Sequence, residues 1–265
     1  MIISGNLKSI LIIKPSSLGD IVHTIPAVAL LRDAHPRAQI SWVINPEFAP
    51  LLRGNSDINH VHLFPRREFR GLGATGNLFR WWRTTKLLRP DLAVDFQGLL
   101  RSALIAKISG AREIYGMSNA REGSRLFYHR IAKVDRRAHA VERYIKLAEC
   151  AGATVGESLR CPIPTGDPLP RFDDYPPFIL LHPFARGGGK SLSNAVIEEF
   201  CRAFLPTRVV IVGQTQNKIE PPENCIELTN QTSLLQLIWL IRAAHLIAIF
   251  APPENCGPSS LATTK

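Results

Sequence analysis

SILIIKPSSLGDIVHTIPAVALLRDA, residues 9–34, contains the pattern that decides the fold. Ser9–Lys14 is a short isoleucine-rich run between polar residues, which is typical of a strand buried on both faces of a parallel sheet. The loop Pro15–Asp20 follows, and the apolar residues of Ile21–Ala34 then recur at helical spacing. This order of strand, loop and helix predicts the first half of a βα unit.

The alternation continues along the chain. Further strands are expected at Ile40–Ile44, Val61–Phe64 and Leu92–Phe96, and a further helix at Leu99–Ile108. Strands that alternate with helices predict an α/β fold with a doubly wound parallel sheet. Ligands of such a sheet bind at the carboxyl ends of its strands, so the loop Pro15–Asp20 is expected to line a binding site.

A proline-rich stretch divides the chain. Residues 162–177 hold many prolines, which remove backbone donors and fix φ, so a linker is expected there. A second α/β series follows it, with strands expected at Phe178–His182, Val209–Val212 and Leu246–Phe250 and helices at Asn194–Phe204 and Ser233–Ala244. We therefore predict two Rossmann-like domains facing a cleft: residues 1–161, the linker 162–177, and residues 178–265.

The composition favours a basic protein of the reducing cytoplasm. Hydrophobic residues make up 45% and charged residues 20%, so a substantial core is expected, and the net charge of +10 favours anionic partners. No segment reaches the roughly 18 apolar residues of a membrane span, and the first apolar run is predicted to be a strand, not a signal peptide. Five scattered cysteines without a CxxC pair indicate neither a disulfide framework nor a zinc site.

Asp20 stands where the first loop meets the first helix. It is expected either to cap the helix or to point a carboxylate into the binding site, and the two roles are compatible. Gly19 lets the backbone turn, and the absence of a GxGxxG pattern argues against a nicotinamide cofactor. Ser16 and Ser17 are expected to bind ligand hydroxyls or to form hydrogen bonds within the loop. His23, three residues after Asp20, is expected to pack in the helix, with a position facing the same binding site as the alternative.

A glycine run in the second half predicts an anion site. Gly187-Gly188-Gly189-Lys190-Ser191 lies between an expected strand and an expected helix, but Phe184 stands where a Walker A loop requires glycine. Exposed backbone N–H groups beside a helix N-terminus and a lysine suit a phosphate. A solvated loop without a ligand is the alternative.

Basic and aromatic residues alternate between Arg66 and Arg89. This pattern fits a surface helix with an aromatic inner face, and it also fits nucleic acid, which binds to arginine and stacks on aromatic rings. Guanidinium groups also bind carboxylates and phosphates through paired hydrogen bonds.

Several segments together resemble glycosyltransferase family 9, the lipopolysaccharide heptosyltransferases, and are most similar to the type I enzymes. The pattern K-x-S-S-x-G-D-x-x-H-T-x-P, residues 14–26, resembles the opening of that family. The later segments come in family order: Asp95-Phe96-Gln97-Gly98-Leu99 with Arg101-Ser102, Gly116-Met117, Ala120-Arg121-Glu122, Phe127-Tyr128, His139-Ala140-Val141-Glu142-Arg143, and His182-Pro183 with Lys190.

The resemblance implies a GT-B fold and inverting transfer of a heptose from an ADP-activated donor to the Kdo inner core of lipopolysaccharide. It implies that Asp20 is the general base, since an inverting transfer needs a carboxylate to accept the proton of the attacking hydroxyl. It further implies neither metal nor cofactor, a cytoplasmic protein that allows peripheral contact with the inner membrane, and no nucleic-acid partner. The acceptor-binding residues implied are Ser16, Ser17, Gly19, Arg66, Arg67, Arg70, Gln97, Arg121 and Arg143, and the donor-binding residues are Arg186, Lys190, Gly257 and Ser259.

The final segment departs from the family pattern D-x-G-x-x-H-L-A. Asn255 stands at the aspartate position and Ser260 at the histidine position, and the sequence ends at Lys265. We therefore expect an incomplete second domain in which Ile247 and Ile249 are exposed. Two alternatives to an active transferase stay open: a binding protein that keeps the acceptor domain without donor chemistry, and a nucleic-acid-binding protein.

Overall fold

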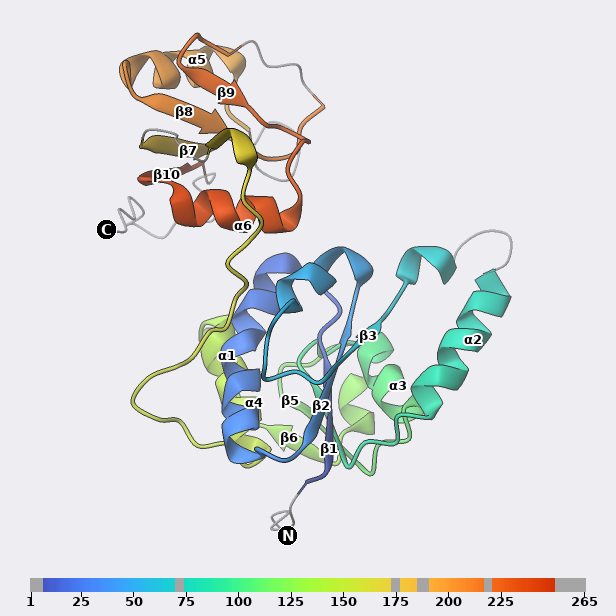
Figure 1. The fold of residues 1–265 in the computed structure, drawn as a ribbon. Coiled ribbons are helices and arrows are strands. Elements are labelled where there is room, and N and C mark those ends of the chain that lie inside the picture. The colour runs from blue at the N-terminus through green and yellow to red at the C-terminus, as the bar shows by residue number, and fades with distance from the viewer. Residues whose placement is uncertain (1–6, 70–73, 173–176, 185–190, 217–220, 251–265) are drawn as a thin grey trace. The chain divides into compact units, whose positions relative to one another are not determined.

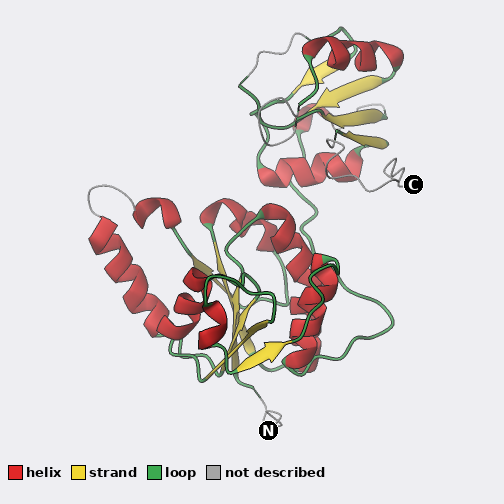
Figure 2. Ribbon diagram, turned by 180° about the vertical axis from the view of Figure 1, so that it is seen from behind, coloured by secondary structure: helices red, strands yellow, loops and turns green. Residues whose placement is uncertain are grey.

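The computed structural model describes residues 7–69, 74–172, 177–184, 191–216 and 221–250, and the chain divides into two compact units, Met1–Pro164 and Thr165–Lys265. Each unit has its own parallel β-sheet with helices on both faces (Figures 1 and 2). This is the α/β arrangement predicted from the alternation of apolar strands and helices.

The first unit contains a six-stranded sheet in the order β3-β2-β1-β4-β5-β6, with every neighbouring pair parallel. Its central strand is formed by the isoleucine-rich run, and Ile10, Leu11, Ile12 and Ile13 are at most 1% exposed. The six strands are β1 (Ser9–Ile13), β2 (Gln39–Ile44), β3 (His60–Leu63), β4 (Leu92–Asp95), β5 (Glu113–Met117) and β6 (Arg130–Ala132).

Helices α1 and α4 cover one face of this sheet, and α2 and α3 cover the other (Figure 1). The α-helices are α1 (Leu18–Ala34), α2 (Ala74–Lys86), α3 (Leu100–Ile108) and α4 (Ala140–Cys150). Short 3-10 helices are η1 (Pro46–Leu52), η2 (Arg66–Phe69) and η3 (Ser124–Phe127), and a fourth, η4 (Pro170–Phe172), lies within the stretch expected to be a linker.

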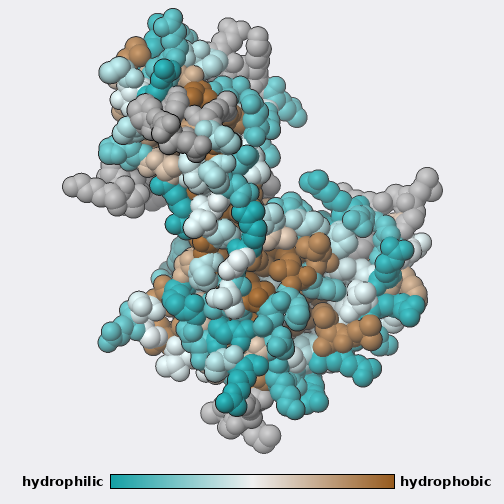
Figure 3. All heavy atoms as spheres, in the orientation of Figure 1, coloured by the Kyte–Doolittle hydropathy of each residue, from teal (hydrophilic) through white to brown (hydrophobic). Residues whose placement is uncertain are grey.

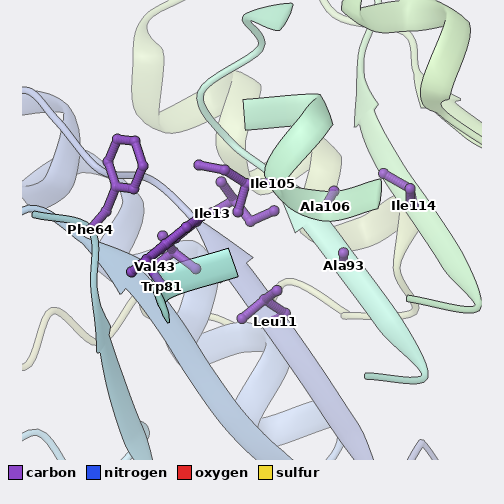
Figure 4. Close-up of a cluster of buried hydrophobic side chains, with 9 residues drawn as sticks. All are labelled: Leu11, Ile13, Val43, Phe64, Trp81, Ala93, Ile105, Ala106 and Ile114. Carbon is purple, nitrogen blue, oxygen red and sulfur yellow. The ribbon is translucent and has the colours of Figure 1, made fainter. Parts of the chain in front are cut away.

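The layer between the sheet and α2–α3 holds a compact apolar cluster (Figure 4). Leu11, Ile13, Val43 and Ala93 come from the strands, and Trp81 comes from α2. Trp81 is 8% exposed, and its indole N–H donates to the Leu63 carbonyl at 2.7 Å. This single tryptophan therefore both packs α2 onto the sheet and satisfies a strand carbonyl.

The second unit has a four-stranded parallel sheet in the order β10-β7-β8-β9. Alternate residues of its central strands face opposite layers: Ile179 and Leu181 pack with α5, whereas Leu180 and Val210 pack with α6. Its elements are β7 (Phe178–His182), α5 (Asn194–Ala203), β8 (Arg208–Ile211), β9 (Cys225–Glu227), α6 (Leu234–Ala243) and β10 (Leu246–Ile249).

Seven expected strands and four expected helices are present, and most of their bounds agree within one or two residues. The first helix begins at Leu18, earlier than expected, and β5, β6, β9 and α4 were not anticipated. The three strands β5, β6 and β9 have only three to five residues each, and a run this short carries little periodicity.

The last strand of the second sheet was expected to be exposed. Ile249 is 70% exposed as expected, but Ile247 packs against the α6 side of the sheet. No helix in the described part of the chain is long and apolar enough to cross a membrane.

Gly116→Ala should destabilise the first unit, because a Cβ at this position of β5 would overlap the ring of Tyr128. Overpacking of this kind costs about 1–3 kcal/mol of unfolding free energy. The matched control is Gly76→Ala in α2, where a Cβ meets no heavy atom within 4 Å and alanine is favoured over glycine by about 0.5–1 kcal/mol. Chemical denaturation of both variants tests this, and equal stability changes would contradict the close packing of Tyr128 on Gly116.

Candidate active site at the carboxyl edge of the first sheet

A buried lysine closes the central strand of the first sheet. Lys14 directly follows β1, and its side chain is only 3% exposed. Its ammonium donates to the Phe96 carbonyl at 3.3 Å, lies 3.7 Å from Asp20 Oδ2, and sits 5.2 Å from the ring centre of Tyr144. Burial lowers the pKa of Lys14, and the charges of Asp20 and Asp95 oppose that shift. An ammonium this deeply buried requires such partners to stay charged.

Asp20 is held by the start of α1. The helix begins after Ser17, which is therefore the N-cap, so the prediction of Asp20 as the N-cap is wrong. Asp20 occupies the third helical position, and its Oδ2 accepts hydrogen bonds from the Ser17 hydroxyl at 2.9 Å and the Ser17 backbone N–H at 3.4 Å. This is the carboxylate half of a capping box, and the helix dipole favours negative charge there.

A tyrosine from α4 completes the environment of Asp20. Tyr144 is 4% exposed, and its hydroxyl donates to Asp20 Oδ1 at 3.3 Å. Burial and the neighbouring Asp20 charge raise the pKa of Tyr144, so its hydroxyl keeps its proton and remains a donor. The Asp20 side chain itself is 38% exposed, which leaves its carboxylate open to a ligand.

The balance of these effects leaves Asp20 ionised. Partial burial on its own would raise the pKa of Asp20, but the Lys14 charge and the hydrogen bonds from Ser17 and Tyr144 outweigh it and hold that pKa below its usual value. A lowered aspartate pKa contributes stability above the pKa of the unfolded chain, and this contribution is lost as the pH falls through the lowered value. Asp20 is therefore a carboxylate at neutral pH.

A second carboxyl group organises the neighbouring loop. Asp95 is 0% exposed, and its Oδ1 accepts from the backbone N–H groups of Gln97 at 2.9 Å and Gly98 at 3.1 Å. Its Oδ2 accepts from the hydroxyls of Tyr128 at 2.7 Å and Ser102 at 2.8 Å. Burial raises the pKa of Asp95, and these four donors oppose the rise. The bonds fix the turn that carries Gln97.

Two adjoining pockets open at this edge of the sheet. The larger, about 450 Å³, is lined by residues that include Asn45, Glu47, Arg66 and Arg67. A smaller one of about 70 Å³ shares Asn45 and Arg66 and is also lined by Ser16 and Gln97. The structure therefore brings four of the predicted acceptor-binding residues, Ser16, Arg66, Arg67 and Gln97, around one hollow region.

Two buried polar atoms without a partner belong to residues that line the smaller pocket, and a third belongs to Arg143 of α4. Asn45 Oδ1, Gln97 Oε1 and Arg143 Nε are buried and have no hydrogen-bond partner among the described residues. Asn45 is 6% exposed and lies directly after β2. Sequence reasoning missed it, although its place at the carboxyl end of a parallel strand was a usable signal. Buried acceptors without partners are costly unless a ligand or water donates to them.

The other predicted residues are distributed as follows. Ser17 and Gly19 are exposed at the start of α1, and Arg143 precedes Tyr144 in α4, where its charge lowers the pKa of Lys14. Arg121 is exposed, and its backbone N–H donates to the Gly98 carbonyl. His23 lies in α1 with its ring 4.8 Å from that of His139. The positions outside the described residues are Arg70, Arg186, Lys190, Asn255, Gly257, Ser259 and Ser260.

Comparison with known proteins finds similarity to one family over part of the chain. Residues 79–190 match the model of glycosyltransferase family 9 (heptosyltransferase). The chain is 36% identical over 142 residues to lipopolysaccharide heptosyltransferase 1 of Pseudomonas aeruginosa, covering 51% of this chain and 40% of that protein. Part of the chain is therefore similar to the family 9 glycosyltransferases.

A second family 9 relative agrees with the first. Lipopolysaccharide heptosyltransferase 1 of Escherichia coli K12 is 31% identical over 143 residues, covering 51% of this chain and 44% of that protein. The chain thus matches less than half the length of these curated relatives. The resemblance to the type I enzymes seen in the motifs is thus matched by sequence similarity over about half of this chain.

Solved family 9 structures confirm the GT-B-like fold class. E. coli heptosyltransferase WaaC with ADP superposes with a TM-score of 0.73 at 21% identity, covering 91% of this chain and 80% of that chain. A family 9 protein from Veillonella parvula superposes with a TM-score of 0.70 at 19% identity, covering 92% and 77%. At these identities the likeness establishes the fold alone.

The contact between Lys14 and Asp20 can be measured by a double-mutant cycle of Lys14→Met and Asp20→Asn. We expect a coupling free energy of about 1 kcal/mol, which is less than the range for fully buried pairs because Asp20 is 38% exposed. Chemical denaturation at neutral pH of the wild type, both single variants and the double variant provides the four values. Strictly additive effects would contradict the pairing.

Proposed function

We propose that this chain is an inverting glycosyltransferase that moves a heptose from an ADP-activated donor to the Kdo inner core of lipopolysaccharide. The observation that carries the proposal is the Asp20 carboxylate. It is ionised, partly open to solvent, and positioned by Lys14, Ser17 and Tyr144 at the edge of a parallel sheet where ligands bind. It also lies in the segment that resembles the opening of family 9.

In the proposed reaction, the acceptor hydroxyl attacks the anomeric carbon of the donor heptose from the face opposite ADP. The new C–O bond forms as the bond to the diphosphate breaks, so the configuration inverts and ADP leaves with the electron pair. The hydroxyl proton passes to Asp20, which must be ionised beforehand to receive it. A bound acceptor would cover Asp20, and this further burial would raise its pKa toward the value that suits a base.

The pockets at the same edge of the sheet combine Arg66 and Arg67 with Glu47 and Glu68, and this lining suits a hydroxyl-rich acceptor that carries carboxylates. Arg66 and Arg67 supply cations that pair with carboxylates. Asn45 Oδ1 and Gln97 Oε1 are buried acceptors that sugar hydroxyls would satisfy. Further acceptor contacts are proposed for Ser16, Ser17, Gly19, Arg70, Arg121 and Arg143.

The donor is proposed to bind to the second domain, residues 178–265, which the linker 162–177 joins to the acceptor domain, residues 1–161. Lys190 and Arg186 would neutralise the diphosphate as it leaves, and Gly257 and Ser259 would lie beside it. Neither a metal nor a cofactor would be required.

The protein would work in the cytoplasm, in peripheral contact with the inner membrane. A protein that binds acceptor without transferring heptose is the alternative, motivated by Asn255 and Ser260.

Asp20→Asn should lower turnover by about 10²–10⁴-fold, the usual range for a lost general base. The variant loses its ion pair with Lys14 but keeps the size of the side chain, and Lys14 keeps its bond to the Phe96 carbonyl, so we expect a lower stability without unfolding. Turnover is therefore measured well below the melting temperature of the variant. Release of ADP and the mass of the glycan product are followed with ADP-heptose and a deacylated acceptor. The matched control is Asp33→Asn, an exposed carboxylate in the same helix, which should keep full activity. An unchanged rate for Asp20→Asn would exclude the base role, and absence of transfer by the wild type would favour the binding protein.

Asn45→Ala should raise the KM for the acceptor about 3–10-fold, the effect of one neutral hydrogen bond, while kcat and the KM for the donor change little. Asn77→Ala in α2 lines neither pocket and serves as the control. Equal changes in both KM values would show that Asn45 acts through the fold and not through the acceptor.

A further inference from the structure

Helix α2 leaves apolar side chains outside the core. Leu78 is 48% exposed and Phe79 is 58% exposed. Together with Trp82 and with Ile108 at the end of α3, they line an apolar hollow of about 430 Å³. Apolar and hydrophilic side chains lie side by side over this helix (Figure 3). Large apolar side chains that cluster on a surface mark an interaction site more often than isolated ones do.

These side chains cannot turn inward, because the inner stripe of α2 is already occupied. Trp81 packs in the core with its ring 5.0 Å from that of Phe64 (Figure 4). One turn later Thr85 is 0% exposed, and its hydroxyl donates to the Trp81 carbonyl at 2.8 Å and lies 2.8 Å from His62 Nε2. The helix is therefore fixed in rotation with its second apolar stripe facing outward.

Cations lie directly on this outward stripe. The guanidinium of Arg83 is 5.9 Å from the ring centre of Phe79, and the Lys86 ammonium is 4.9 Å from that of Trp82. The two rings stack at 5.9 Å. Residues 69–90 include five Lys and Arg residues and neither Asp nor Glu. We name Leu78, Phe79, Trp82, Arg83 and Lys86 the α2 face.

We propose that the α2 face docks onto an anionic phospholipid surface, with the rings and Leu78 at the level of the headgroups and Arg83 and Lys86 on the phosphates. Aromatic rings prefer the membrane interface, and a basic, amphipathic helix binds there through apolar burial and attraction to anionic lipids together. Nucleic acid would use the cations and rings but would leave Leu78 and Ile108 in water. The inference deepens the peripheral membrane contact within the proposed function by naming the surface that makes it.

The test is co-sedimentation of the full chain with phosphatidylcholine vesicles, with and without phosphatidylglycerol. The vesicles contain no saccharide, so binding is independent of acceptor recognition and of transfer. The wild type should bind only the anionic vesicles. Arg83→Gln with Lys86→Gln should weaken that binding about 25-fold, at about fivefold per cation, and Phe79→Ser should weaken it about tenfold or more.

The matched control is Arg136→Gln with Arg137→Gln, which removes the same charge from an exposed loop before α4 and should reduce binding much less. Thermal unfolding of each variant confirms that it is folded. Equal losses for the α2 and control pairs, or equal binding to neutral vesicles, would overturn the proposal. So would tighter binding to random DNA than to anionic vesicles, or a dimer in solution that Phe79→Ser dissociates. If Asp20→Asn abolishes transfer but binds vesicles as the wild type does, membrane docking is independent of catalysis. If the wild type binds vesicles but transfers nothing, only the transferase proposal fails.

Discussion

A charged lysine buried at the end of the central strand is the constraint on which the first unit is built. Lys14 has almost no contact with water, so its ammonium must be compensated from within the protein. The compensation comes from three different segments: Asp20 from α1, the Phe96 carbonyl after β4, and the ring of Tyr144 from α4. Elements far apart in sequence are therefore tied to one point at the carboxyl edge of the sheet.

The same compensation sets the chemistry of Asp20. Burial on its own would raise the pKa of the Asp20 carboxyl group. Coulomb attraction to a cation in a partly dry environment is much stronger than in water, and Lys14 together with the hydrogen bonds from Ser17 and Tyr144 outweighs that burial. Tyr144 and Ser17 fix its two oxygens. The arrangement keeps a carboxylate charged, oriented and accessible, which are the properties that a general base requires in its resting state.

Much of the fold was predictable from local patterns. Ser9–Ile13 and Phe178–His182 are continuous apolar runs, and such runs predict parallel strands even without a partner in view. The loop after the first strand was predicted to line the site because the carboxyl ends of parallel strands form the binding edge. The short strands β5 and β6 were missed because their pairing in the sheet, and not their own periodicity, defines them.

The partners within the site were less predictable. Tyr144 contacts Asp20, which lies 124 residues away in the sequence, because α4 packs against α1. Neither segment on its own specifies that contact. Asn45 acquires its significance only because its Oδ1 is buried without a partner among the described residues. The role of Ser17 as the helix cap depends on the backbone conformation at the start of α1. Residue types are visible in a sequence, whereas burial and unsatisfied atoms emerge from packing.

Lys14, Ser17 and Tyr144 lower the pKa of Asp20 in spite of its partial burial, and the pKa of Asp20 in the folded chain tests this most directly. Carbon-detected NMR can follow the side-chain carboxyl carbon of Asp20 during a pH titration, with Asp20→Asn used to assign the signal. We expect a pKa below the ordinary aspartate value of 3.8. A value at or above that figure would mean that burial outweighs the lysine charge and the hydrogen bonds from Ser17 and Tyr144, and it would contradict the pairing described here.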